Sequence, residues 1–154
     1  MMKQIAVAGL VVLAGGVAAQ TCTCEGAGNT RIQDAALTAA LSGNTVCVPN
    51  AAGWEWQEQH RAVTAGVSRS GELWDFKRGP GHAIDPTKRV GDWAITATTI
   101  AGGEHVSHSY LGGSGSSYSY KVCRVGATAS YGFCPVIAGP IIMSTIKPGI
   151  SGCP

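Results

Sequence analysis

Four side chains on one short segment could act together on a ligand. From residue 54 to residue 61 the chain reads Trp-Glu-Trp-Gln-Glu-Gln-His-Arg. Alternate residues of a β-strand point to the same side, so Trp54, Trp56, Glu58 and His60 would share a face. Aromatic rings beside hydrogen-bonding groups suit a small molecule or a saccharide. These four residues are the candidate ligand-binding set. The pattern favours a competing interpretation, with both tryptophans in the core and the two polar residues at a solvated strand end.

A carboxylate beside an imidazole could also relay a proton or hold a metal ion. A second candidate metal pair, His105 and His108, lies in a strand-like segment, which sends the two rings to opposite faces. We expect His108 to be partly buried and hydrogen-bonded on the face of Val106 and Tyr110. Ser114 lies in Gly-Ser-Gly without the strand-to-helix turn of a nucleophile elbow. We therefore predict no catalytic residue, no metal site and no cofactor.

The cysteines predict a protein stapled by disulfides, because their number is even and no Cys-x-x-Cys metal pair is present. The six are Cys22, Cys24, Cys47, Cys123, Cys134 and Cys153. Cys22 and Cys24 are too close to bridge to each other comfortably. If the turn within residues 126–130 is tight, Cys123 and Cys134 lie opposite one another, at a separation that a disulfide accepts. By elimination, the two amino-terminal cysteines would then bridge to Cys47 and Cys153, with the order open.

The first residues predict export. A positive start with Lys3 precedes an apolar run, and small residues before Gln20 suit a signal peptidase, so residues 1–19 are a predicted signal peptide. The run is too short to span a bilayer. Residues 20–154 would form one domain without a membrane span, secreted to the periplasm or the extracellular medium. Without Lys3, ten Lys and Arg face nine Asp and Glu, so the charge gives no reason to expect a nucleic-acid partner.

The hydrophobic pattern predicts one helix followed by strands. Asn29 or Thr30 could cap the helix, and Gly43 suits its left-handed end. The residues at helical spacing are Ile32, Ala36, Leu37, Ala40 and Leu41. After Gly43 the apolar residues alternate in short runs bounded by Gly, Pro, Ser or Asp. We predict a mainly β fold with about seven or eight antiparallel strands in a barrel or sandwich.

These observations favour an exported, non-enzymatic module that binds a small-molecule or saccharide ligand, or another surface. One alternative is a structural or assembly subunit of an extracellular layer or filament, because the strand-prone tail from Pro140 to Ile146 could pair with a neighbouring chain. A second alternative is a small secreted hydrolase or metalloenzyme that uses Glu58 and His60.

Overall fold

The computed structural model describes residues 22–24, 26, 28–50, 53–75, 87–112 and 116–154, with the backbone alone at residues 50 and 53–55. The predicted signal peptide, the side chain of Trp54, and Ser114 lie outside this description.

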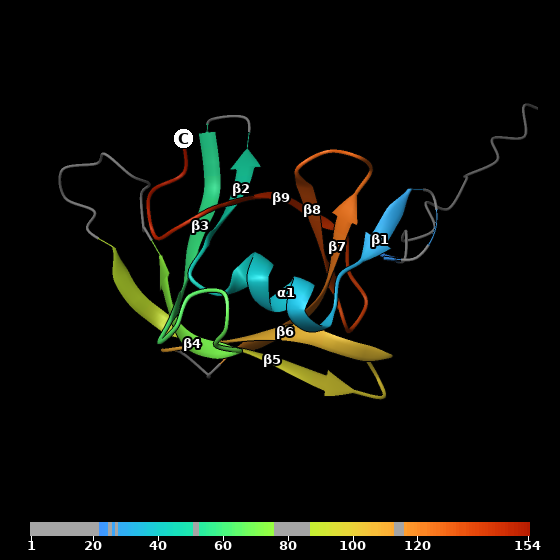
Figure 1. Ribbon diagram of the computed structural model, residues 1–154, viewed down its shortest axis with the longest axis horizontal. Helices are drawn as coiled ribbons and strands as arrows, with labels where there is room; N and C mark the ends of the chain where they lie inside the picture. Colours follow the sequence, from blue (N-terminus) through green and yellow to red (C-terminus); the bar gives the residue numbers. More distant parts are fainter. Residues whose placement is uncertain (1–21, 25, 27, 51–52, 76–86, 113–115) are drawn as a thin grey trace, which may run out of the picture.

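Within the described residues the chain forms one helix and nine strands (Figure 1). The elements are β1 (Asn29–Arg31), α1 (Asp34–Leu41), β2 (Thr45–Asn50), β3 (Gly53–Ala62), β4 (Ser70–Asp75), β5 (Lys88–Thr98), β6 (Gly103–Tyr110), β7 (Ser117–Val125), β8 (Ser130–Pro135) and β9 (Ile142–Lys147).

The strands form a closed antiparallel barrel. From β2 to β9, each strand pairs with the next one along the chain, and β9 returns to pair with β2. Val46 of β2 lies opposite Ile146 of β9 at this closure. The predicted mainly β class is confirmed, and of the two predicted architectures the molecule has the barrel. The short strand β1 was not predicted, and it pairs with β7 outside the ring of eight.

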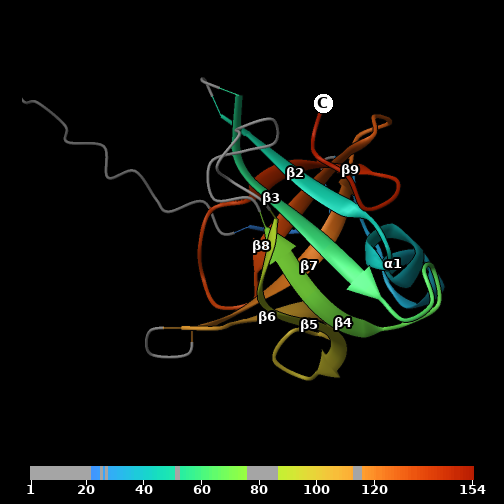
Figure 2. The same cartoon turned by 90° about the vertical axis from the view of Figure 1, so that its left-hand side faces the viewer.

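The two ends of the barrel differ. At one end, here called the helix end, α1 packs Leu37 and Leu41 against the interior core. Figure 2 shows α1 at the end toward which β3 points. At the opposite end, the loop end, β2, β4, β6 and β8 finish and the segments that lead to the next strands begin. The described residues contain no helix with the length and apolar character of a membrane span.

Alternation along the strands places one set of large apolar side chains inside the barrel. The buried members are Leu37, Leu41, Val46, Val48, Leu73, Trp93, Ile95, Val106, Tyr120, Val122 and Phe133. Because each strand of the ring from β2 to β9 has a neighbour on both sides, the ring has no free edge and paired backbone surrounds its interior.

The helix begins later than predicted. Neither Asn29 nor Thr30 caps it, because both lie in β1, and Gln33 at the N-cap position forms no side-chain cap. The carboxylate of Glu104, distant in sequence, instead accepts a hydrogen bond from the Asp34 amide at 2.6 Å. A carboxylate at this position satisfies an exposed amide and interacts favourably with the helix dipole. Gly43 adopts the predicted left-handed conformation, with φ of 79°.

All six cysteines form disulfides, but the predicted pairing is wrong. Cys22 bonds to Cys134, Cys24 to Cys123, and Cys47 to Cys153. The turn after β7 pairs Val125 with Ser130, which places Cys123 opposite Gly132 instead of Cys134. This shift of two residues keeps both cysteines on the outer face but moves them out of direct opposition. Each then meets one amino-terminal cysteine.

A disulfide map tests this pairing. Trypsin cleaves after Arg124, chymotrypsin after Phe133 and cyanogen bromide after Met143, so the three carboxy-terminal cysteines fall on separate peptides. We expect non-reducing mass spectrometry to find the peptide with Cys22 and Cys24 joined to those with Cys123 and Cys134. A peptide pair joined directly through Cys123 and Cys134 would contradict the structure.

Candidate functional site

The strand β3 places three of the predicted site residues inside the barrel. Trp56, Glu58 and His60 alternate with outward residues and therefore share the inner face. Glu58 and His60 are fully buried, whereas Trp56 is partly buried against the core. The interpretation that placed Glu58 and His60 at a solvated strand end is therefore wrong, because barrel closure encloses that face.

The strand β6 contributes two more polar side chains to the same interior. His108 is fully buried and Tyr110 is half-buried. Both belong to the inner face of β6, and His105 belongs to the opposite face, as the strand alternation predicted. Two strands, β4 and β5, separate β3 from β6 in the sheet. Contacts between their side chains must therefore cross the interior.

Three contacts join the two strands across the barrel. The Tyr110 hydroxyl donates a hydrogen bond to Oε1 of Glu58. Oε2 of Glu58 lies 3.3 Å from Nδ1 of His108. Nε2 of His108 lies 3.0 Å from Nε2 of His60, within hydrogen-bond distance. We call Glu58, His60, His108 and Tyr110 the interior polar cluster.

Aromatic rings enclose this cluster. Trp93 meets the His60 ring edge-on at a centroid distance of 5.4 Å, and Tyr120 lies 5.7 Å from the His108 ring. Trp93 is held in turn by a hydrogen bond of 3.0 Å from its indole nitrogen to the Arg61 carbonyl. Gly71 makes this approach feasible, because a Cβ there would lie 1.9 Å from the Arg61 oxygen. The cluster is therefore held in a rigid, largely apolar setting.

Three atoms of the cluster retain hydrogen-bonding capacity. Within the described part of the chain, Oε2 of Glu58 and the Nδ1 atoms of His60 and His108 are buried without a hydrogen-bond partner, although Oε2 of Glu58 and Nδ1 of His108 face each other. Most buried polar groups in native proteins are hydrogen-bonded, and an unsatisfied one costs about 1–3 kcal/mol. A cluster with spare capacity inside a barrel can accept a hydrogen bond from a ligand or donate one to it.

Burial sets the charge of the cluster. Desolvation raises the pKa of Glu58 to about 8, opposed by the Tyr110 hydrogen bond and reinforced by the nearby Asp75. Desolvation lowers the pKa of His60 to about 4, with the backbone carbonyl of Glu58 opposing it. Desolvation, with a smaller contribution from His60, holds the pKa of His108 well below its usual range. At pH 7 most of the cluster is therefore uncharged, with Glu58 carrying a proton.

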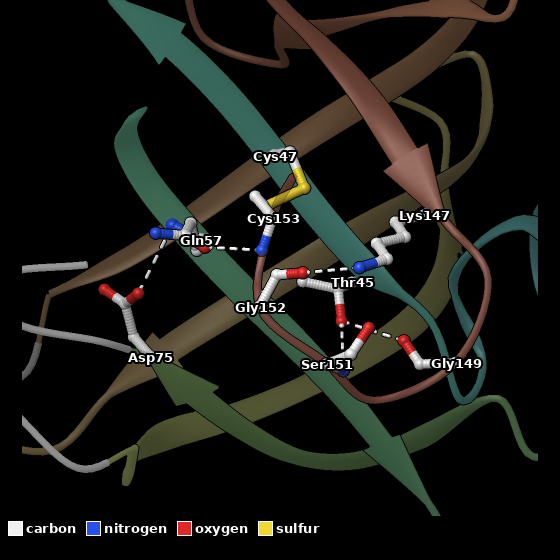
Figure 3. The surroundings of a disulfide bond; sticks show 9 residues. All are labelled: Thr45, Cys47, Gln57, Asp75, Lys147, Gly149, Ser151, Gly152 and Cys153. Atoms are coloured by element: carbon white, nitrogen blue, oxygen red, sulfur yellow. Dashed lines mark hydrogen bonds between the residues drawn. A yellow bond between two sulfur atoms is a disulfide. The ribbon is translucent and has the colours of Figure 1, made fainter. Parts of the chain in front are cut away.

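The carboxy-terminal tail supports β3 from the outside. Oε1 of Gln57, a fully buried residue, accepts a hydrogen bond of 2.7 Å from the Cys153 amide. The backbone amide of Gln57 donates a hydrogen bond to the Asp75 carboxylate at 3.3 Å. Figure 3 shows the tail returning over β2, where Cys153 bonds to Cys47. The segment of β3 next to Glu58 is therefore held by one hydrogen bond to its side chain and one from its backbone.

The donor atoms do not converge on one metal position. His108 directs Nδ1 toward Glu58 and Nε2 toward His60, so the three side chains offer no common centre. Among the described residues, the one group of three converging metal-ligand types consists of Cys24, Cys123 and Cys134. Their sulfur atoms are already consumed in disulfides.

Sequence reasoning identified half of the cluster. It singled out Glu58 and His60 but left His108 and Tyr110 as core residues of a separate strand. A signal was present, since a histidine interrupts the apolar face of Val106 and Tyr110 just as Glu58 and His60 follow Trp56.

The chain matches no protein-family model, and comparisons with curated proteins and with solved structures found no match. The argument for function therefore depends on the geometry of the described residues.

The pKa values predict an unusual dependence of stability on pH. In the unfolded chain Glu58 ionises near its ordinary pKa of 4.5, whereas in the folded protein it keeps its proton to about pH 8. Glu58 therefore lowers the free energy of unfolding progressively from pH 4.5 to pH 8, by up to about 1.4 kcal/mol per pH unit. His60 and His108 act in the other direction, because both have lowered pKa values in the folded protein and each loses stability as the pH falls below 6.5. Below pH 6.5 the two histidines together outweigh Glu58. We expect maximum stability near pH 6.5.

The substitution Glu58→Gln should abolish the loss of stability between pH 6.5 and pH 8, because an amide does not ionise. Urea denaturation at half-unit steps of pH measures this. Glu72→Gln is the matched control, since Glu72 lies on the exposed side of β4. Parallel profiles for the wild type and the Glu58→Gln variant would show that Glu58 is not a buried acid.

Proposed function

We propose that this protein binds a small, uncharged, hydroxyl-bearing molecule inside the barrel, at the interior polar cluster. The observation that carries this proposal is the pair of buried polar atoms, on Glu58 and His108, that have no hydrogen-bond partner in the described chain. A cluster needed for stability alone would gain from satisfying both atoms.

The architecture supports this assignment. An eight-stranded barrel has an interior just wide enough to be filled by side chains or to hold one small ligand. Here α1 and the apolar core fill the helix end. Tyr110 is the last residue of β6, which places the cluster toward the loop end, and Tyr118 near the start of β7 is half-exposed there. A ligand would approach from the loop end.

The ligand class follows from the charge of the cluster. At neutral pH most of its members are uncharged, so an ionic ligand would lose its hydration without finding an opposite charge. A hydroxyl group can both donate and accept a hydrogen bond. It therefore matches a protonated carboxyl group and a neutral imidazole, each of which also offers one donor and at least one acceptor. The partly exposed ring of Tyr118 and that of Trp56 could pack against an apolar ring or sugar face. Uncharged saccharides, each with several hydroxyl groups, meet these requirements.

The two alternative functions receive less support. An assembly subunit was suggested by a strand-prone tail, but β9 is paired on one side with β2 and on the other with β8, so it offers no free edge. A metalloenzyme needs converging ligands, and the donor atoms of Glu58, His60 and His108 diverge.

We further propose that the protein acts outside the cytosol. Three disulfides fit an oxidising compartment, where such bonds persist. Removal of residues 1–19 during export remains part of this proposal.

Tryptophan fluorescence tests the proposed function. Trp93 contacts His60 of the cluster, whereas Trp74 lies on the outer side beneath Arg61. We expect at least one member of a panel of neutral monosaccharides to change the fluorescence of the wild type and of Trp74→Phe. The substitution Tyr110→Phe should weaken binding about tenfold, because it removes one hydrogen bond from the cluster.

Tyr131→Phe is the matched control, since Tyr131 contacts Arg124 near the helix end and not the cluster. It should bind as the wild type does. A panel without any effect on fluorescence, or equal losses in the two tyrosine variants, would refute an interior ligand site.

A further inference from the structure

A second site lies on the outside of the barrel wall. A cavity of about 620 Å³ lies beside β6 and β7, between the hairpin that joins β5 to β6 and the segment that joins β8 to β9. Its wall includes Thr98, Ile100, His105, Tyr118, Ser119 and Ile137. No member of the interior polar cluster contributes to it. Its volume falls within the range of roughly 300–1,000 Å³ found for small-molecule sites.

The rim of this outer cavity is unusually apolar for a surface. Ile100 is 81% exposed and Ile137 is 84% exposed, and each comes from a different connecting segment. A hydrogen bond of 2.8 Å from the Val136 amide to the Ser119 carbonyl fixes the second segment against β7. Large aliphatic side chains therefore lie on both sides of a cavity with one fixed wall. A ligand that covers them would gain about 25 cal/mol of binding free energy for each Å² of apolar surface buried.

One polar residue of the wall, His105, has a ring nitrogen without a partner among the described residues. His105 is only 5% exposed, and its Nε2 lies 3.1 Å from the Thr96 hydroxyl. Its Nδ1 is buried without a hydrogen-bond partner in the described part of the chain. If Nε2 carries the proton and donates a hydrogen bond to the Thr96 hydroxyl, Nδ1 is a hydrogen-bond acceptor.

Three of the other hydroxyl-bearing side chains of the wall are already paired. The Ser119 hydroxyl lies 2.8 Å from that of Ser107, and the Ser117 hydroxyl lies 3.2 Å from that of Ser109. The Thr98 hydroxyl accepts a hydrogen bond from the Ala101 amide. No Asp, Glu, Lys or Arg is among the described residues of the wall. These residues therefore combine apolar surface with few polar groups, namely the His105 ring and the hydroxyls of Tyr118 and Tyr120.

We propose that the outer cavity binds a predominantly apolar small molecule with one hydroxyl group, an aliphatic or aromatic alcohol. The ligand hydroxyl donates a hydrogen bond to Nδ1 of His105, and its hydrocarbon part covers Ile100 and Ile137. This site is distinct from the interior polar cluster, because none of the four cluster residues lines it, although Tyr118 and Tyr120 border both regions.

Calorimetric titration with 2-naphthol, and with its methyl ether 2-methoxynaphthalene, tests this proposal. The two compounds share the ring system, but the ether cannot donate a hydrogen bond. We expect 2-naphthol to bind about tenfold more tightly, since one hydrogen bond is at stake. In His105→Leu this preference should disappear, while affinity for the ether is kept.

Ile137→Asp should abolish binding of both compounds, because it places a charge against the ligand hydrocarbon. Ile137 is exposed, so this variant keeps the test valid even if His105→Leu does not fold. Val63→Asp, at an exposed residue between β3 and β4, is the matched control and should bind normally. No binding of 2-naphthol, or equal binding by the wild type and Ile137→Asp, would overturn the proposal.

Discussion

The pairing of β9 with β2 is the constraint on which the rest of the structure depends. This ladder joins the last strand to the first strand of the ring and closes the barrel. Once closed, the sheet has an inner and an outer face. Successive side chains along each strand then point alternately into the interior and toward the surface. The Cys47–Cys153 disulfide and the Cys153–Gln57 hydrogen bond reinforce the closure on its outer side. An open sheet would leave Glu58 and His60 on a face that water could reach, and burial would no longer control their charge.

Closure also imposes a cost, because it encloses ionisable side chains that water would otherwise solvate. The protein limits this cost by keeping the carboxyl group of Glu58 protonated and both histidines neutral, which avoids buried net charge. Tyr110 satisfies one carboxyl oxygen, and His108 and His60 satisfy each other in part. The remaining unsatisfied atoms are those on which the proposed ligand site depends. In that proposal, stability and recognition depend on the same side chains.

The barrel wall separates two environments of different chemistry. Inside, polar groups cluster among aromatic rings; outside, beside the same strands, an apolar cavity contains one buried imidazole. The strand β6 supplies the decisive group to each side, with His108 facing inward and His105 outward. A separation of three residues in an extended strand sends the two rings to opposite faces. Disulfides on the outer face, linking the amino terminus to β7 and β8, stabilise the wall near both regions.

Local pattern in the sequence determined the strands of the ring, the shared face of Trp56, Glu58 and His60, and the involvement of every cysteine in a disulfide. These properties depend on side-chain alternation and on the number of cysteines, which are visible residue by residue. Only the tertiary structure decided that Cys123 meets Cys24, because a two-residue shift in register depends on the turn that follows β7. The same holds for β1, whose three residues form a strand only by pairing with β7. The contact between Glu58 and His108 likewise spans two intervening strands, and no periodicity along the chain encodes how a closed sheet brings such side chains together.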